Sequence, residues 1–140
     1  MFAAGERFAD MQVYLGTDMT AISRIERLLQ EYPDRFREFA FTADEQSYCE
    51  SAAHPAQHYA ARWAVKEAYI KSVDGFDSPP DLRSIEVEPT TPPRLSLTGD
   101  GEELLDALMG DGSRDAATDV SLGHERSVDL AFATVVVLIH

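Results

Sequence analysis

Lysine is almost absent from this chain of 140 residues, since only Lys66 and Lys71 occur and both lie in segment 63–71 beside Glu67. Every other basic side chain is arginine. An ammonium group is a compact point charge on a flexible stem, suited to phosphate binding or proton transfer, whereas guanidinium is a rigid planar fork. The alternative interpretation is that the chain is simply poor in lysine and that these two lysines fall close together by chance. Segment 63–71 is therefore the first place to look for chemistry.

Cysteine and long apolar runs are equally scarce. Cys49 is the only cysteine, so no intrachain disulfide can form; no motif marks it as a nucleophile, and a reducing cytoplasm is expected. The longest apolar run, 130–139, is far shorter than the roughly 20 residues that span a bilayer. Its consecutive valines predict a buried strand instead. Neither end resembles a secretory signal, so we expect a cytoplasmic protein without membrane contact.

Positive charge is also in short supply, because 12 Lys and Arg face 25 Asp and Glu and leave a net charge of −13. Phosphate backbones and anionic membranes attract basic surfaces, so this excess argues against both as partners. It would also suit solubility in concentrated salt, where surface charge is strongly screened. Residues 22–39 are an exception, because four arginines there balance four acidic residues. The arginines are Arg24, Arg27, Arg35 and Arg37.

A chain of this length fits one domain, and we expect residues 1–140 to form a single α+β unit with residues 1–10 as a loose extension. Alternating apolar residues predict a strand over 11–15, which places Asp18 at a strand-to-helix junction. Two capping-box spacings predict helix starts. They are Ser23 with Glu26, whose helix runs to Pro33, and Thr42 with Glu45, whose helical stretch runs to Pro55.

A central helix is predicted over 56–73. Its alanines repeat every four residues, at Ala60, Ala64 and Ala68, which lets another backbone pack closely against it. The remaining expected elements are half-buried strands over 85–88 and 95–98, an acidic helix over 102–109, a polar loop over 111–119 and a last strand over 130–139.

On the central helix Glu67 and Lys71 are four residues apart and share a face with Trp63. Taken alone, such a pair is an ordinary surface salt bridge worth roughly a few tenths of a kcal/mol. Three further features join it: Asp18 after the first strand, Arg24 six positions later, and Ser121-Leu-Gly-His124 before the last strand. In that company the pair becomes a candidate site. His54 and His58 also have i, i+4 spacing, but no third transition-metal ligand accompanies them.

Three blocks of sequence carry a family resemblance. They are Gly16-Thr-Asp18 with Ile22-Ser-Arg24-Ile25-Glu26, then Arg62-Trp-Ala-Val-Lys66-Glu67-Ala-Tyr-Ile-Lys71, then Ser121-Leu-Gly-His124-Glu125. In this order they resemble the holo-acyl-carrier-protein synthases, the short branch of the 4'-phosphopantetheinyl transferases. The resemblance runs from about Met11 to the C-terminus, and the Trp-x-x-Lys-Glu-Ala-x-x-Lys block is its most specific part. It implies the fold of that family, a small antiparallel sheet packed on a long central helix.

The resemblance implies Mg²⁺-dependent transfer of 4'-phosphopantetheine from coenzyme A to a serine of an apo acyl carrier protein, with adenosine 3',5'-bisphosphate leaving. By the same resemblance Asp18 and Glu67 hold Mg²⁺, and Lys71 stabilises charge on the transferred phosphoryl group. Either Glu67 or a metal-bound water would remove the serine proton. The expected coenzyme-binding residues are Arg62, Lys66, Lys71, Ser121 and His124. The expected catalytic residues are Glu67, Lys71 and His124.

A homotrimer is implied as well, with active sites between subunits, so that the two carboxylates of one subunit meet coenzyme contacts of its neighbour. Carrier proteins of this kind are acidic, and the helix with Arg24 and Arg27 is therefore the expected docking surface. Alternatively, these arginines only pair with Glu26 and Glu31 on a solvated helix.

Three positions depart from the family pattern. Gly123 stands where Ser or Thr is usual, loop 74–80 is acidic where a glycine-rich loop is common, and Thr91-Pro-Pro-Arg94 replaces Gly-Lys-Pro. Beside a carrier of fatty-acid biosynthesis, two alternatives therefore stay open. One is a polyketide or other secondary-metabolism carrier as the client, and the other is a non-catalytic trimeric protein that binds coenzyme A.

Overall fold

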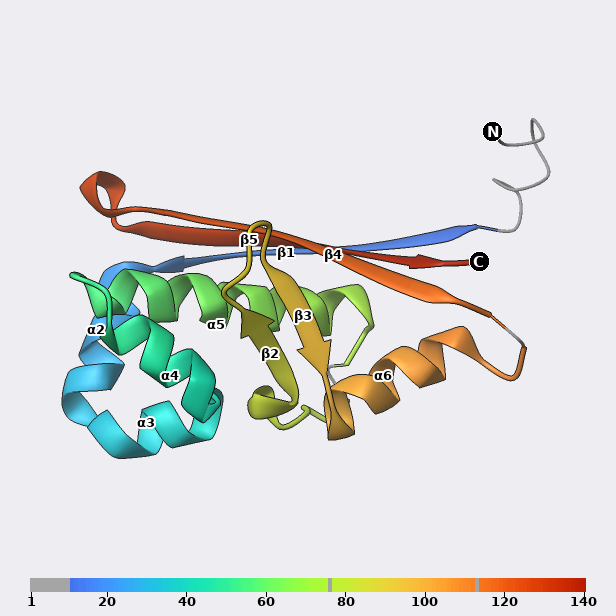
Figure 1. Ribbon diagram of the computed structural model, residues 1–140, viewed down its shortest axis with the longest axis horizontal. Helices are drawn as coiled ribbons and strands as arrows, with labels where there is room; N and C mark the ends of the chain where they lie inside the picture. Colours follow the sequence, from blue (N-terminus) through green and yellow to red (C-terminus); the bar gives the residue numbers. More distant parts are fainter. Residues whose placement is uncertain (1–10, 76, 113) are drawn as a thin grey trace.

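The computed structural model describes residues 11–75, 77–112 and 114–140, so the expected extension over 1–10 lies outside the described residues. The elements follow one another along the chain as Figure 1 shows. They are β1 (Gln12–Ala21), α2 (Ile22–Glu31), α3 (Pro33–Ala40), α4 (Ala43–Glu50), α5 (Pro55–Ser72), the 3-10 helix η1 (Leu82–Ser84), β2 (Ile85–Glu88), β3 (Arg94–Leu97), α6 (Gly99–Met109), β4 (Ala116–Glu125), the 3-10 helix η2 (Arg126–Val128) and β5 (Leu130–Ile139). The predicted α+β class is confirmed.

The main sheet has three antiparallel strands in the order β1-β5-β4 and lies along α5 (Figure 1). The strands β2 and β3 form a separate antiparallel pair on the other side of that helix. The apolar run of β5 supplies the strand at the centre of the sheet. Its buried residues alternate along the strand and are Ala131, Ala133, Val135, Val137 and Ile139. The predicted packing of a small antiparallel sheet on a long helix is thus confirmed.

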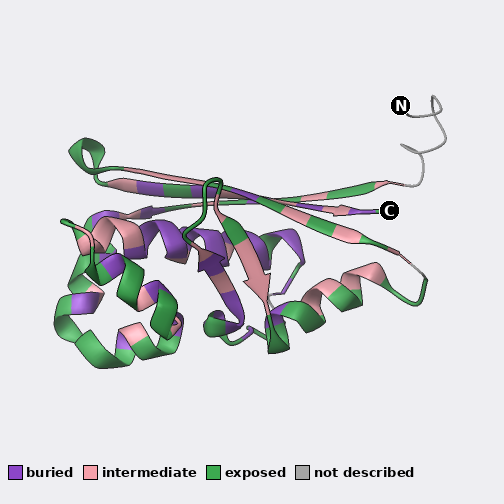
Figure 2. Cartoon of the chain, viewed as in Figure 1, coloured by how far each residue is buried: buried purple, intermediate pink, exposed green. Residues whose placement is uncertain are grey.

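The helix α5 is the core of the molecule and is buried over most of its length (Figure 2). Ala60, Ala64 and Ala68 are fully buried, as their spacing predicts. Their small side chains let β1 approach the helix backbone at Gly16. A Cβ atom added to Gly16 would lie 1.8 Å from the carbonyl oxygen of Ala68 and 2.9 Å from the amide nitrogen of Ser72. The absence of a side chain at this position therefore sets how closely strand and helix pack.

The prediction that β1 ends before Asp18 is wrong. The strand continues to Ala21, and Asp18 pairs with Ala133 in the middle of an unbroken ladder with β5. Gly16 and Asp18 are typical of turns, but the long partner strand offers pairing over its whole length. Tertiary pairing therefore overrides the local turn signal.

The two predicted capping boxes have opposite outcomes. Thr42 and Glu45 form a complete capping box at the start of α4, which confirms the prediction. The box of Ser23 and Glu26 is wrong, because α2 begins without a side-chain cap. Instead the Ser23 amide donates a hydrogen bond of 2.7 Å to the carboxylate of Asp129, at the far end of the chain. A distant acceptor has replaced the local one.

Other boundaries also differ from the predictions. The helix α3 was not predicted, although Pro33 stands in its first turn, where proline is well tolerated. The strand β4 begins at Ala116, inside the predicted loop 111–119, and α6 begins at Gly99 rather than near residue 102. The predictions for α5, β2, β3 and β5 agree closely with the structure.

One face of the main sheet carries apolar side chains that none of the described residues covers. Register pairs Leu15 with Val136 and Met19 with Phe132, so these residues share the face turned away from α5. Exposure reaches 62% at Leu15, 69% at Met19 and 43% at Phe132. The Phe132 ring occupies the space over Gly123, where an added Cβ would lie 2.5 Å from its Cζ atom. Within residues 11–75, 77–112 and 114–140, an apolar sheet face is therefore left exposed to water.

None of the helices among the described residues is both long and apolar enough to cross a membrane.

Replacing Gly16 with alanine should destabilise the fold by about 2–3 kcal/mol, in the upper part of the usual range for overpacking. The new methyl group would overlap the backbone of α5 at Ala68 and Ser72, which cannot move like a side chain. Urea unfolding at fixed protein concentration measures the change. The matched control is Gly112→Ala, because a Cβ there meets only the Arg114 side chain, at 3.3 Å. Equal stability of the two variants would contradict the close strand–helix contact.

Candidate active site

Three predicted site residues from two elements come together at the β1 edge of the sheet. Asp18 lies on β1 and faces α5, where its side chain is 16% exposed. The Lys71 ammonium donates hydrogen bonds of 2.8 Å to Asp18 Oδ1 and 3.0 Å to the carbonyl oxygen of Thr17. Glu67 lies one turn before Lys71 on α5. Strand and helix thus join residues that are about fifty positions apart in sequence.

The carboxylates of Asp18 and Glu67 interact electrostatically. Burial raises the pKa of the half-buried Glu67, and the charge of Asp18 raises it further, while Lys71 and Arg24 act to lower it. Two carboxylates that repel each other at a partly exposed site gain by sharing a cation. Among residues 11–75, 77–112 and 114–140, no group of three or more His, Cys, Asp or Glu side chains could hold a metal ion. Two carboxylates nevertheless fit Mg²⁺, which binds proteins through one or two carboxylates and completes its shell with water and phosphate.

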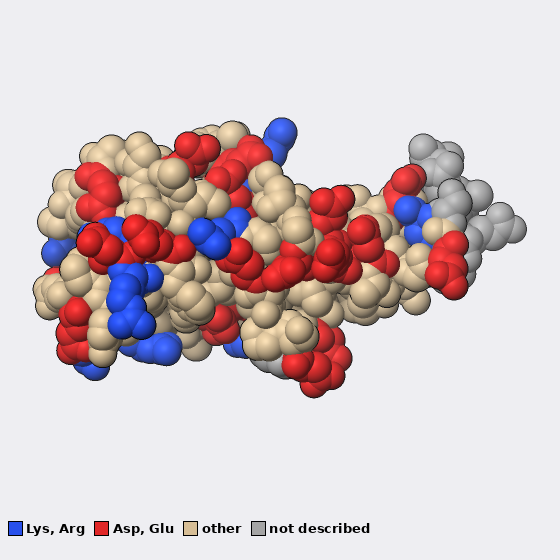
Figure 3. All heavy atoms as spheres, turned by 90° about the horizontal axis from the view of Figure 1, so that it is seen from below, with Lys and Arg blue, Asp and Glu red and all other residues tan. Residues whose placement is uncertain are grey.

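The predicted docking helix α2 lies next to this carboxylate–lysine cluster, which we define as Asp18, Glu67 and Lys71. Arg24 is close enough to Glu67 to influence its pKa, and both Arg24 and Arg27 are exposed. Basic side chains gather at the end of the molecule that carries α2 to α4, while acidic ones dominate the α6 half (Figure 3). The exposed arginines of α2 therefore border the candidate site.

A second group of predicted residues lies in a small pocket of about 180 Å³. Arg62 on α5 and His124 on β4 both line it. Two further lining residues, Tyr48 on α4 and His58 on α5, were not predicted as coenzyme contacts. The sequence singled out His58 only for its i, i+4 spacing to His54, and it gave no signal for Tyr48. The transition-metal reading of His54 with His58 receives no support from the described residues.

The two groups face opposite sides of α5. Arg62 and Glu67 are five residues apart, which turns their side chains by about 140° from each other around a helix. Asp18 is on β1 and His124 is on β4, the two edges of the sheet. Ser121 lies on the exposed outer face, because it pairs with Thr134 two residues along from Phe132. One chain therefore brings Asp18, Glu67 and Lys71 together but keeps three other predicted coenzyme contacts, Arg62, Ser121 and His124, apart from them.

Two larger hollows, of about 600 Å³ and 630 Å³, are lined by residues of α3, α4, η1 and the start of α6. No predicted site residue lines either of them.

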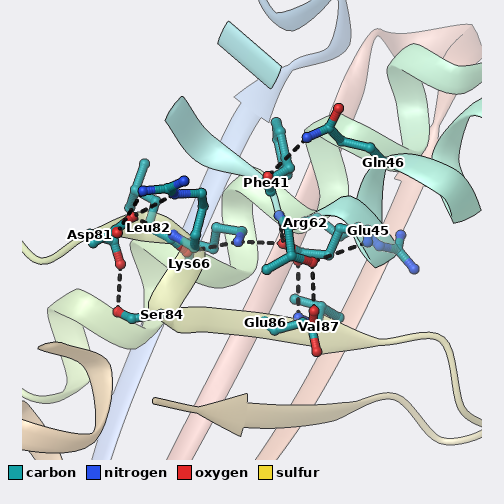
Figure 4. A network of polar contacts seen from close by, with 12 residues as sticks. Phe41, Glu45, Gln46, Arg62, Lys66, Asp81, Leu82, Ser84, Glu86 and Val87 are labelled. Carbon is teal, nitrogen blue, oxygen red and sulfur yellow. Dashed lines mark hydrogen bonds and ion pairs between the residues drawn. The ribbon is translucent and has the colours of Figure 1, made fainter. Parts of the chain in front are cut away.

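Lys66 does not have the environment that a phosphate contact requires. Its side chain is fully buried, and its ammonium donates hydrogen bonds of 2.7 Å to Glu45 and 2.8 Å to the carbonyl oxygen of Leu82 (Figure 4). Glu45 is equally buried and also accepts from the amide of Val87. Burial lowers the pKa of Lys66, and the charge of Glu45 opposes this shift. The phosphate role expected for Lys66 is thus not supported, and the residue instead ties α4, α5 and β2 together.

Comparisons with known proteins agree with the sequence motifs. A model of the 4'-phosphopantetheinyl transferase superfamily matches residues 14–130. The holo-[acyl-carrier-protein] synthase of Syntrophus aciditrophicus is 38% identical over 116 residues, which cover 80% of this chain and 86% of the relative. That of Ruminiclostridium cellulolyticum is 36% identical over 129 residues, covering 89% and 92%.

Solved structures show the same fold. The ACPS–CoA complex of Chronobacterium ammoniagenes superimposes with a TM-score of 0.73 at 26% identity and covers 90% of this chain and 96% of that one. The acyl carrier protein synthase of Mycobacterium tuberculosis gives a TM-score of 0.63 at 33% identity, covering 89% and 95%.

The chain therefore belongs to the 4'-phosphopantetheinyl transferase superfamily. Within it, the relatives that match over most of their length are holo-acyl-carrier-protein synthases. The resemblance inferred from the three sequence blocks is confirmed, and so is the predicted enzyme class, a 4'-phosphopantetheinyl transferase.

The two lysines should respond differently to the same substitution. Lys66→Met leaves Glu45 buried without its cation and should destabilise the protein by about 3–5 kcal/mol. Lys71→Met removes a partly exposed ion pair and should cost less than about 1 kcal/mol. Urea unfolding of both variants at one protein concentration measures the difference. Unfolding free energies within about 1 kcal/mol of each other would contradict the structural role of Lys66.

Proposed function

We propose that this protein transfers 4'-phosphopantetheine from coenzyme A to a serine hydroxyl of an apo acyl carrier protein and releases adenosine 3',5'-bisphosphate. The observation that carries this proposal is the convergence of Asp18, Glu67 and Lys71 at one edge of a fold shared with holo-acyl-carrier-protein synthases. The names of the related proteins and the coenzyme in one solved relative support the substrate pair.

In the proposed reaction the serine oxygen forms a bond to the phosphorus that carries the pantetheine arm. The bond from that phosphorus to the bridging oxygen of the pyrophosphate breaks, and the bisphosphate leaves with the electron pair. Both the pyrophosphate and the approaching oxygen are electron-rich, so positive charge at the reacting phosphorus lowers the barrier. The Lys71 ammonium is this chain's own source of such charge, and Asp18 holds it in position at 2.8 Å.

Asp18 and Glu67 would hold Mg²⁺, which supplies further charge neutralisation at the pyrophosphate when it is bound. Glu67 is also the carboxylate that we propose as acceptor of the serine proton. The aspartate, the glutamate and the lysine thus divide three tasks, which are cation binding, phosphoryl stabilisation and acceptance of the serine proton. Arg24 is close enough to Glu67 to influence its pKa, and we propose that Arg24 and Arg27 on α2 receive the acidic carrier protein next to the reacting group.

We further propose a homotrimer whose active sites lie between subunits. The uncovered apolar face around Leu15, Met19 and Phe132 supports association, because burying it against another copy removes apolar surface from water. The separation of the carboxylate–lysine cluster from Arg62 and His124 supports sharing of the site, because neither group alone suffices for the reaction. One subunit would supply the cluster and its neighbour the coenzyme contacts.

The transfer is tested by incubating the protein with coenzyme A, Mg²⁺ and a panel of apo carrier proteins from fatty-acid and polyketide synthesis, and reading the intact mass of each carrier. We expect one or more carriers to gain the phosphopantetheine mass. Asp18→Asn and Glu67→Gln should each lower the rate at least about a hundredfold, since each removes charge at the reacting centre. Glu103→Gln on the exposed face of α6 is the charge-matched control.

Wild-type rates for both the Asp18 and Glu67 variants would refute the metal assignment. Coenzyme binding without mass gain on any carrier would instead favour the non-catalytic alternative.

Sharing of the site between subunits is tested by mixing two inactive variants. Glu67→Gln damages the carboxylate–lysine cluster, which is one half of the proposed site. His124→Ala removes a coenzyme contact, which belongs to the other half. After unfolding and refolding of an equal mixture, random assembly restores about a quarter of the sites, each with one intact half from either variant. Recovery of about a quarter of the wild-type rate is therefore expected. Refolded single variants are the controls, and no recovery in the mixture would mean that each chain builds its own site.

A further inference from the structure

Histidines gather at the small pocket on the β4 side of α5. The chain has four histidines, and two of them, His58 and His124, line this pocket together with Arg62 and Tyr48. A third, His54, is the residue that precedes α5, four positions before His58, and is close enough to influence the pKa of His58. In a chain with a net charge of −13, this is a local concentration of groups that are or can become positive.

Arg62 is the fixed positive charge of this pocket. The residue is 3% exposed, and its guanidinium stacks over the Tyr48 ring at 4.2 Å. The Nη1 atom of Arg62 donates a hydrogen bond of 3.3 Å to the carbonyl oxygen of His58. Its buried Nε has no hydrogen-bond partner among the described residues. Arg62 also lines the pocket, and its charge and N–H donors favour an anionic ligand with acceptor oxygens there.

His58 is the titratable residue at the centre of the group. Its ring packs edge-on against that of His124, with centroids 5.0 Å apart, and against Tyr48 at 5.8 Å. Burial lowers the pKa of His58, and the charges of His124, Arg62 and His54 lower it further. Gln57 from its own helix contacts the ring, at 3.5 Å.

Acidic groups offer little compensation to this positive cluster. Glu125 interacts with His124, but it is fully exposed and its carboxylate is already bonded to Ser127. In the described part of the chain, the charged groups that act on His58 are His124, Arg62 and His54, with no carboxylate among them. His58 is therefore neutral near pH 7 in the free protein, and an anion in the pocket would favour its protonation.

We propose that His58 is a further coenzyme-binding residue, which with Arg62 and His124 selects the 3'-phosphate of coenzyme A and takes up a proton as that phosphate binds. The inference rests on the proposed function. Coenzyme A carries two anionic groups, and its pyrophosphate has to lie at the carboxylate–lysine cluster, where the phosphoryl group is transferred. The other anionic group is the 3'-phosphate, and this pocket, which the neighbouring subunit would supply in the proposed trimer, offers a cationic site of matching charge.

The 3'-phosphate of coenzyme A and the imidazole of His58 both change charge near neutral pH, and their charges are opposite. A phosphomonoester loses its second proton near pH 6 and is a dianion above it. An imidazole beside a dianion has a raised pKa, so His58 becomes charged in the complex at a pH where it is neutral in the free protein. The proton gained on binding means that coenzyme affinity rises as pH falls from 8.5 to 6.5. A coenzyme without the 3'-phosphate offers no dianion to the pocket and lacks this dependence.

Calorimetric titration with coenzyme A and with 3'-dephospho-coenzyme A, at pH 6.5 and 8.5, tests the proposal on the full-length protein. Two buffers of different ionisation enthalpy count the protons taken up. His58→Phe is the test variant, because phenylalanine preserves ring packing against Tyr48 and His124 but cannot carry charge. We expect the variant to bind coenzyme A about tenfold more weakly at pH 6.5, as is typical for loss of a hydrogen bond to a charged group.

At pH 8.5 the affinity of His58→Phe should lie within about twofold of wild type, and so should its affinity for 3'-dephospho-coenzyme A at both pH values, because a neutral imidazole gives no charge-assisted bond. Proton uptake should fall in the variant. His140→Phe, the same change at the exposed fourth histidine, is the matched control and should behave as wild type. Should His58→Phe fold poorly, as judged by circular dichroism, His58→Gln tests the same loss of charge.

Unchanged preference for the 3'-phosphate and unchanged proton uptake in these variants would overturn the proposal and leave His58 a packing residue. A wild-type protein that transfers the pantetheine arm equally well from both coenzymes, at either pH, would also overturn it while leaving the proposed function intact. A wild-type protein that binds neither coenzyme and modifies no carrier would refute the proposed function itself.

Discussion

The contact between the backbone of α5 and β1 is the constraint on which the arrangement of the site depends. At Gly16 strand and helix are so close that no Cβ fits between them. This spacing lets Lys71 reach from the helix to both Asp18 and the main-chain carbonyl of Thr17. A wider gap would leave the two carboxylates too far apart to influence each other. The small residues of α5 and β1 thus allow the close approach of strand and helix that brings Asp18 near Glu67 and Lys71.

The same helix holds two lysines in opposite environments. Lys66 is sealed between α4, α5 and β2 by Glu45 and the carbonyl of Leu82. Lys71 stands at the surface with an exposed side chain and a single carboxylate partner. A buried ion pair repays its desolvation only when every donor and acceptor is satisfied, which binds its members to one conformation. A partly exposed ammonium can exchange its partner for a phosphate. Exposure, and not residue type, separates the structural lysine Lys66 from Lys71, for which we propose a role in the reaction.

The candidate site residues are divided between the two sides of α5, and this division suggests a role in assembly for the apolar outer face of the sheet. The helix stands between the carboxylate–lysine cluster and the pocket of Arg62 and His124, and we therefore propose that two chains direct these groups at one ligand. Apolar residues on the outer face of the sheet favour association with further copies. Assembly and completion of the site are therefore linked in our proposal, because the contact that buries Leu15 and Phe132 would also bring the two halves together.

Local patterns in the sequence predicted the elements whose stability depends on near neighbours. The helix α5, the capping box of Thr42 with Glu45 and the apolar strand β5 belong to this group. Elements that depend on distant partners were missed or cut short. The strand β1 was predicted to stop before Asp18 because its turn-like residues were weighed without the ten-residue ladder that β5 provides. Residues 116–119 were assigned to a loop for the same reason.

The sequence by itself determined the family and three of the residues that meet at the β1 edge. The reason is that the order and spacing of charged residues can be recognised from the sequence before the fold is known. Only the tertiary structure decided which lysine is enclosed, that Ser121 faces outward, and that Tyr48 and His58 join Arg62 at a pocket. The physical reason is that solvent exposure and the direction of a side chain depend on what packs against it, and those neighbours come from remote parts of the chain.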